Sequence, residues 1–140
     1  MRKPLLFSVV LAVMVAWAPF APARTTITMY DPRPNTKVGE IVDTLLAEFR
    51  EQNPDIDVEY VHIPGSYSGV REKTSVAIAG GAAPNVVILD QTHWFAFAYA
   101  NHLLPLDEFI AQDPTVSLDD YYPGIVNFLT WEGHVWGLPY

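Results

Sequence analysis

The stretch that decides the fold runs from residue 41 to residue 89 and reads IVDTLLAEFREQNPDIDVEYVHIPGSYSGVREKTSVAIAGGAAPNVVIL. It combines an amphipathic helix, an alternating strand, a Gly-Ser-Tyr turn, a second helix that ends in two glycines, and a short apolar strand. This order is typical of a βαβ unit, in which helices join parallel strands and cover the sheet. The sequence therefore predicts an α/β fold in which this segment delivers polar residues to a ligand cleft.

The first helix is predicted by the spacing of its apolar residues. Six of them recur at the interval of one helical stripe: Val38, Ile41, Val42, Leu45, Leu46 and Phe49. Asn35 or Thr36 can cap the start of this helix. Asn53-Pro54 is expected to end it, because proline cannot continue a helix.

Three segments predict strands, namely residues 25–30, 56–61 and 86–89. The first two alternate polar and apolar residues, as half-buried strands do. The third has no polar alternation, which favours a parallel strand covered on both faces. The second helix lies between the last two strands, with Ser66 or Ser68 as its cap and Gly80-Gly81 at its end.

The remaining third of the chain predicts short elements. A helix is expected from His93 to Tyr99, another around residues 107–110, short helices separated by prolines in residues 113–128, and a last strand at residues 134–138. No cap or terminal turn follows residue 138. The chain is therefore expected to be the N-terminal part of a longer protein.

Residues 1–23 have the pattern of a secretory signal peptide. Arg2 and Lys3 precede the apolar run from residue 5 to residue 18, and the small-residue triplet 21–23 follows. The run is short for a membrane span, which needs about 20 apolar residues. Without any cysteine, the chain can form no disulfide and accept no lipid on an N-terminal cysteine. We expect cleavage near Ala23 and a periplasmic or secreted protein.

The charge of residues 24–140 excludes one class of partner. Removal of residues 1–23 leaves 16 acidic and 6 basic residues, a net charge of −10. Such a surface repels nucleic acid and anionic lipid. The remaining segment has the length of one ordinary domain, and no cofactor or metal motif is found in it.

Six stretches in order resemble one family, the bacterial extracellular solute-binding proteins (family 1) of ABC importers for sugars, oligosaccharides and glycerol phosphate. They are IVDTLLAEFREQNP (41–54), GSY (65–67), KTSVAIAGGAAP (73–84), VVILD (86–90), LLPLDEF (103–109) and the segment 122–140 that ends in GHVWGLPY. The resemblance implies a periplasmic-binding-protein-like (type 2) lobe, a mixed sheet flanked by helices. It also implies that residues 24–140 are the incomplete N-terminal lobe of a two-lobed, monomeric protein that closes over solute and docks on membrane permease subunits.

The candidate binding residues follow the carboxyl ends of the predicted strands, where ligands of open α/β sheets bind. Sugar recognition needs charged or amide groups for hydroxyls and aromatic faces for the sugar ring. The residues of these types are Asp31, Arg33, Tyr67, Asp90, Gln91, Trp94 and Tyr140. The resemblance adds that Tyr67 and Tyr140 match tyrosines at the family's cleft.

Each candidate also has a structural interpretation. Asp31 and Asp90 can terminate strands or cap helices. Arg33 lies between two prolines and can be a solvated loop residue, and Trp94 lies in an aromatic cluster that is typical of a core. Tyr140, as the last residue of the chain, can be frayed.

Two functions remain open besides solute binding. A secreted carbohydrate-active enzyme would use Asp31, Asp90 or Glu132 as acid and base, and an adhesive fragment would bind no solute. The four histidines lack the spacing of a zinc site. In GSYSG (65–69), tyrosine occupies the position that a serine nucleophile needs. The sequence therefore favours binding over catalysis.

Overall fold

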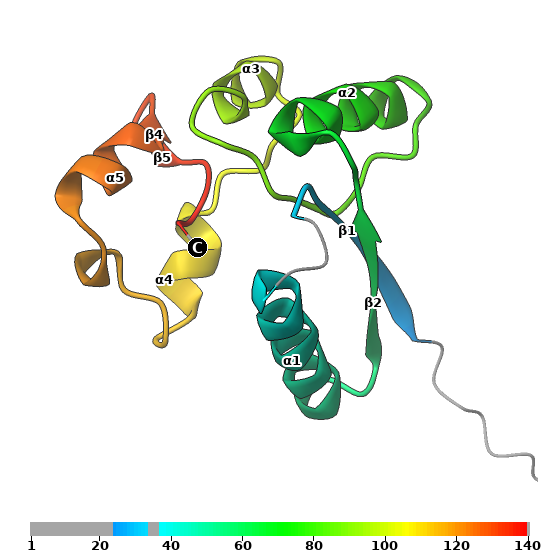
Figure 1. Cartoon of the computed structure of the whole chain (residues 1–140). Helices are drawn as coiled ribbons and strands as arrows, with labels where there is room; N and C mark the ends of the chain where they lie inside the picture. Colours follow the sequence, from blue (N-terminus) through cyan, green and yellow to red (C-terminus); the bar gives the residue numbers. More distant parts are fainter. Residues whose placement is uncertain (1–23, 34–36, 140) are drawn as a thin grey trace, which may run out of the picture.

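The computed structural model describes residues 24–33 and 37–139 (Figure 1). Its elements are β1 (Thr25–Asp31), α1 (Lys37–Gln52), β2 (Ile56–His62), α2 (Ser66–Ala79), β3 (Val86–Val87), α3 (Trp94–Tyr99), α4 (Asp107–Gln112), the 3-10 helix η1 (Leu118–Asp120), α5 (Pro123–Phe128), β4 (Thr130–Trp131) and β5 (His134–Val135). This order confirms the predicted helices and strands, except that β4 was not predicted and that the strands predicted at residues 86–89 and 134–138 are each only two residues long. The predicted signal peptide, the predicted cap of α1 and Tyr140 lie outside the described residues. None of the helices in the described ranges has the length and hydrophobicity needed to cross a membrane.

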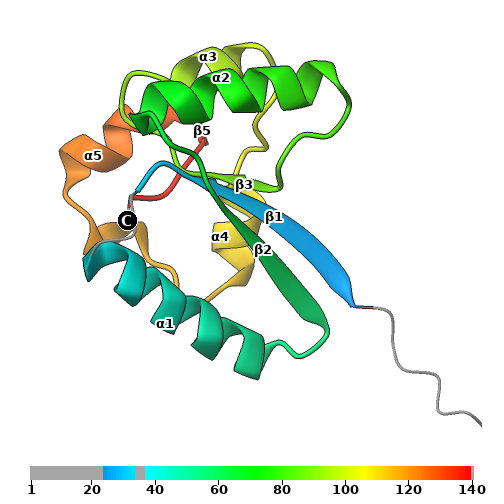
Figure 2. The same cartoon turned by 45° about the vertical axis from the view of Figure 1, so that its right-hand side comes forward.

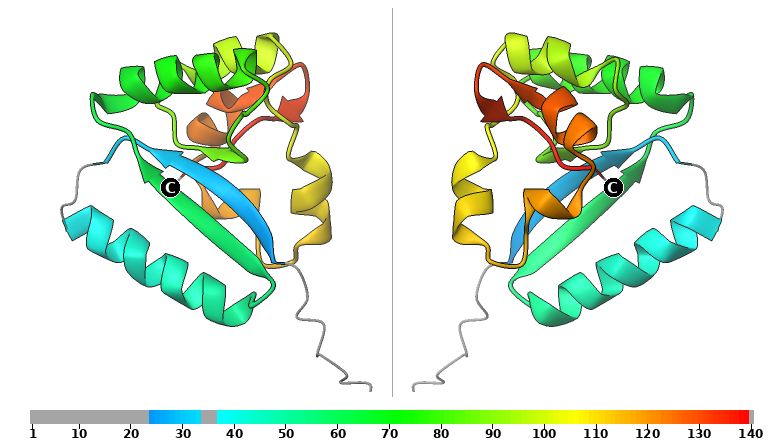
Figure 3. Two further views of the ribbon diagram at one scale, coloured as in Figure 1. Left: turned by 90° about the vertical axis from the view of Figure 1, so that its right-hand side faces the viewer. Right: turned by 90° about the vertical axis from the view of Figure 1, so that its left-hand side faces the viewer.

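The main sheet has three strands in the order β2-β1-β3, and both strand pairs are parallel. Figures 2 and 3 show α1 on one face of the sheet, and α2 with α3 on the other. The two faces are used because β1-α1-β2 and β2-α2-β3 cross in opposite directions along the sheet, and such crossovers are right-handed. The α/β prediction is confirmed. The antiparallel strands β4 and β5 form a separate hairpin, which turns through Glu132 and Gly133 in the left-handed region (φ 51° and 82°).

The core lies between the sheet and α2. Tyr30, Ile63 and Val70 are its buried residues, and Val61, Ala77, Val87 and Leu89 pack against them. On the other face, Val42 of α1 and Val58 of β2 are also buried. Val70 of α2 packs against Tyr30 at the end of β1 and Ile63 just after β2. These contacts hold the first turns of α2 against the edge of the sheet where the strands end.

Part of the apolar stripe of α1 is exposed, and the predicted coverage of β3 on both faces is wrong. In α1, only part of the apolar stripe faces inward, because Val38, Ile41 and Leu45 remain 42%, 58% and 57% exposed. Similarly, Val86 of β3 is 40% exposed, since no described element covers that face of the strand.

The start of α2 has an unusual backbone. Gly65 and Ser66 both have positive φ angles, 97° and 65°, and no side chain caps the helix. The predicted serine cap is therefore wrong, whereas the predicted end at Gly80-Gly81 is confirmed. Gly69 permits this tight start, because a Cβ there would lie 2.5 Å from the carbonyl oxygen of Pro64.

Candidate functional site

The carboxyl ends of the three parallel strands meet at one edge of the sheet. In the strand register Asp31 lies beside His62, and Tyr30 lies beside Val87. Backbone hydrogen bonds continue this alignment into the loops, from Ile63 N to the Asp31 oxygen (2.8 Å) and from Ile88 N to the Tyr30 oxygen (2.9 Å). The loops after β1, β2 and β3 therefore lie next to one another, as predicted for a ligand site of an open α/β sheet.

A first cavity, which we call the Arg33 pocket, opens between the loops after β1 and β2. It encloses about 420 Å³. Its lining consists of Pro32, Arg33, His62, Pro64, Gly65, Ser66 and Tyr67. The left-handed turn at Gly65 and Ser66 brings the Tyr67 side chain to this pocket.

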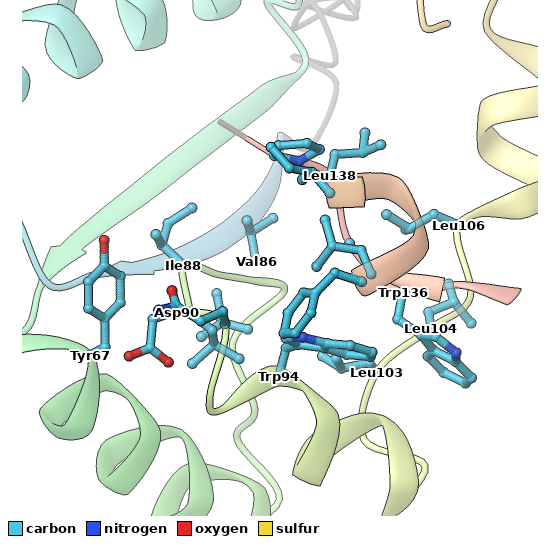
Figure 4. Close-up of a pocket in the computed structure, with 18 of the residues that line it drawn as sticks. Tyr67, Val86, Ile88, Asp90, Trp94, Leu103, Leu104, Leu106, Trp136 and Leu138 are labelled. Atoms are coloured by element: carbon cyan, nitrogen blue, oxygen red, sulfur yellow. The ribbon is translucent and has the colours of Figure 1, made fainter. Parts of the chain in front are cut away.

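A second cavity, which we call the Asp90 pocket, lies along the exposed side of β3 and encloses about 710 Å³. Figure 4 shows Tyr67 and Asp90 at one end of it, and Leu104, Leu106 and Trp136 at the other. Gln91 and Trp94 also line it, together with apolar residues from α3 to the last segment of the chain. Tyr67 belongs to both pockets, so the two cavities share one wall.

Asp31 does not line either pocket, because it is fully buried beneath the Arg33 pocket. Its Oδ1 accepts hydrogen bonds from the backbone N (2.8 Å) and the Nε (2.9 Å) of Arg33, and its Oδ2 accepts from Nε (2.9 Å) and Nη2. The phenol of Tyr60 also helps to lower the pKa of Asp31. The structure therefore favours the structural interpretation of Asp31, which holds Arg33 at the pocket wall.

The charge on Asp31 is maintained in spite of its burial. Burial alone would raise the pKa of Asp31, but the hydrogen bonds and the positive charge of Arg33 outweigh this effect, so the pKa lies below its ordinary value. Burial and the neighbouring carboxylate raise the pKa of Tyr60 to about 12. At neutral pH the cluster consists of an ionised Asp31, a protonated Tyr60 and the Arg33 cation, which together carry no net charge.

Asp90 is held differently, with one carboxylate oxygen engaged. Its Oδ1 accepts hydrogen bonds from the backbone N (2.9 Å) and the Oγ1 (2.8 Å) of Thr92, and lies 2.6 Å from Nδ1 of His93. Burial alone would raise the pKa of Asp90, but the interactions with Thr92 and His93 lower it by more, so the pKa lies below its ordinary value. The group is therefore a carboxylate at neutral pH. Its side chain is 23% exposed.

Trp94 is both a packed residue and a wall of the Asp90 pocket. The residue is 8% exposed, and its ring meets Phe95 and Phe128 edge to face at centroid distances of 5.8 and 5.9 Å. Its indole Nε1 is buried and has no hydrogen-bond partner among the described residues. Gln91, by contrast, is exposed. Of the seven predicted residues, four line the Asp90 pocket or both pockets, Arg33 lines its own pocket, Asp31 lies beneath it, and Tyr140 lies outside the described residues.

The residues proposed for catalysis do not come together. Asp31 is buried against Arg33, and Glu132 lies in the hairpin turn and lines neither pocket. Within residues 24–33 and 37–139 there is no group of three metal-ligating side chains. The sequence did not indicate the apolar wall of the Asp90 pocket, because its residues, such as Leu103 and Phe128, read individually as ordinary core residues.

Comparison with known families identifies the class of protein that this fold and site define. Residues 33–140 match the family described as bacterial extracellular solute-binding protein. The chain belongs to this family. A comparison with curated proteins gave no match.

Three solved structures of ligand-binding proteins share the fold. The sugar-binding protein MalE from Xanthomonas citri is 32% identical, with a TM-score of 0.71 over 82% of this chain and 28% of that one. UgpB from Mycobacterium tuberculosis, in complex with glycerophosphocholine, is 27% identical, with a TM-score of 0.72 over 82% of this chain and 30% of that one. The maltose-bound MalE3 from T. maritima is 29% identical, with a TM-score of 0.65 over 79% and 27% of the two chains. The periplasmic-binding-protein-like fold is confirmed, and this chain spans less than a third of the length of each of these proteins.

Proposed function

We propose that the protein containing this chain captures a hydroxyl-rich solute and delivers it to the permease subunits of an ABC importer. The solute would be a sugar, an oligosaccharide or a glycerol-phosphate-type compound. In this proposal residues 1–23 are a cleaved signal peptide, and residues 24–140 belong to the N-terminal lobe of a monomeric, periplasmic or secreted protein. Family membership and the binding proteins among its structural relatives support this assignment.

The observation that carries the proposal is the pair of pockets that share Tyr67 at the strand ends. They present a guanidinium on Arg33, a phenol on Tyr67 and a carboxylate on Asp90, with the Gln91 amide nearby. Sugar hydroxyls both donate and accept hydrogen bonds, and these groups supply both partners. The charge balance between Asp31 and Arg33 suits a solute that is rich in hydroxyls rather than one of high charge.

The solute classes are supported by the complexes of similar proteins. Maltose is bound to the T. maritima relative, and glycerophosphocholine to the mycobacterial one. The GacH receptor of Streptomyces glaucescens, 26% identical with a TM-score of 0.63, is described in complex with acarbose. Binding alone would favour the closed form of a two-lobed protein, which is the form that a permease can recognise.

The test uses the full-length protein without residues 1–23. It is mixed separately with maltose, mannobiose, acarbose and glycerophosphocholine, and its melting temperature, heat of binding and released reducing ends are measured. We expect one of these solutes to stabilise the folded state by about 2.7 kcal/mol at one hundred times its dissociation constant, with no product. The variant Asp90→Ala should weaken binding, whereas Asp120→Ala, which changes an exposed aspartate outside both pockets, should not.

Two outcomes would contradict the proposal. Released reducing ends would favour the carbohydrate-active enzyme that the sequence left open. A protein that folds cooperatively but binds none of the four solutes would contradict the proposed solute class.

A further inference from the structure

The imidazole of His93 contacts Asp90, one of the candidate binding residues. Its Nδ1 lies 2.6 Å from Oδ1 of Asp90, and both side chains are about four-fifths buried, with exposures of 20% and 23%. The backbone N of His93 also donates to the Asp90 carbonyl oxygen at 3.3 Å. His93 is the residue that immediately precedes α3, so these contacts tie the loop after β3 to a helix.

The groups that contact the Asp90 carboxylate all meet one oxygen. Thr92 donates two hydrogen bonds to Oδ1, and Nδ1 of His93 lies 2.6 Å from the same oxygen and 3.3 Å from Oγ1 of Thr92. Among the described residues, Oδ2 receives no hydrogen bond from a side chain or the backbone. A carboxylate with one oxygen anchored presents the other in a defined direction, which lowers the ordering cost of binding.

We propose that His93 is a positioning residue that anchors Oδ1 of Asp90, so that Oδ2 is presented to a solute hydroxyl in the Asp90 pocket. This inference rests on the proposed function, since it explains how the solute site would hold the Asp90 carboxylate that accepts from the solute. The role requires the imidazole proton on Nδ1, because the carboxylate oxygen can only accept. Thr92 and His93 both lie in the turn between Asp90 and α3, and His93 is the residue next to the helix.

The test compares three variants of the full-length protein. His93→Phe removes the donor, His93→Asn retains a donor close to the position of Nδ1, and His134→Phe is the matched control. His134 also pairs with an aspartate, since its Nδ1 lies 3.1 Å from Oδ2 of Asp107, but neither residue lines a pocket. Maltose, acarbose and glycerophosphocholine are the probes for affinity, and carbon NMR of the Asp90 carboxyl group follows its titration.

We expect His93→Phe to raise the titration midpoint of Asp90 and to weaken the best probe roughly tenfold, as loss of a hydrogen bond to a charged group does. His93→Asn should recover most of both effects, and His134→Phe should show neither. An Asp90 midpoint that does not change in His93→Phe would overturn the inference, as would a raised midpoint with unchanged affinity.

Two further measurements separate this inference from the proposed function and from misfolding. If the wild-type protein binds none of the probes, the proposed function fails, while the Asp90 titration still decides the anchoring contact. If His93→Phe does not fold, nitrogen NMR of the wild-type His93 ring decides it. A proton on Nδ1 supports the inference, and a proton on Nε2 with Nδ1 bare overturns it.

Discussion

Replacement of Asp31 by asparagine tests how the Arg33 pocket is built. Asparagine retains one acceptor oxygen for the Arg33 backbone N and Nε, but it presents an amide NH₂ group where Oδ2 now accepts from Nη2. Loss of a hydrogen bond between charged partners costs about 1.5–3 kcal/mol, and a buried pair that loses one partner costs up to about 3–5 kcal/mol. Because the Arg33 side chain is still 19% exposed, we expect a loss near the lower figures, about 2–3 kcal/mol.

The assay is urea unfolding of the full-length protein at pH 7, followed by circular dichroism, with Asp120→Asn as the control. The midpoint should fall in Asp31→Asn with an unchanged denaturant slope, which would show that stability rather than compactness has changed. The control aspartate is exposed and should lose less than about 0.5 kcal/mol. Equal losses in the two variants would refute the role assigned to Asp31.

The same comparison has a defined pH dependence. The pKa of Asp31 in the folded protein lies below the ordinary value of 3.8, so its ionisation stabilises the fold at pH values above 3.8. This contribution is lost as the pH falls from 3.8 through the folded pKa. The difference in stability between wild type and Asp31→Asn should therefore be constant at neutral pH and shrink below about pH 4. A difference that grows in acid would contradict this cause.

Three other predictions concern the start of α2, the shared pocket wall and export. Gly69→Ala should destabilise the protein by about 1–3 kcal/mol in a thermal melting experiment, because the new Cβ would lie 2.5 Å from the Pro64 carbonyl oxygen. The control is Gly124→Ala, where no atom lies within 4 Å of the new Cβ. It should be neutral or slightly stabilising. Tyr67→Phe should fold normally and weaken solute binding two- to tenfold, the worth of one neutral hydrogen bond, as measured by calorimetry; unchanged affinity would remove this hydroxyl from the site. Mass spectrometry of the exported protein should show an N-terminus just after Ala23, and an intact residue 1 would contradict the signal peptide.

Much of the fold could be predicted because its signals are local. The helical stripe of α1, the alternation in β2 and the glycines after α2 each depend on neighbouring residues alone. The position of the site followed from one general property of parallel sheets, since loops after adjacent strands meet at the same edge. These features needed no knowledge of distant contacts.

The features that were missed depend on contacts between distant segments. The burial of Asp31 and the effect of Tyr60 on its pKa depend on the pairing of β1 with β2, which one strand alone does not reveal. His93 could have been found from its spacing, because a histidine three residues after a strand-end aspartate can reach back to it across one turn.

Tyr67 forms a wall of two cavities, and this has a consequence for which solutes the protein would prefer. A compound that reaches into only one cavity orders the phenol ring and gains contacts with one side of it. A compound that extends into both cavities orders the ring once and gains contacts on both sides. Substitutions in the Arg33 pocket and in the Asp90 pocket should then have non-additive effects on the free energy of solute binding. This non-additivity should disappear once the Tyr67 ring is removed. Such a protein would rank its solutes by chain length before it ranked them by the identity of any one sugar unit.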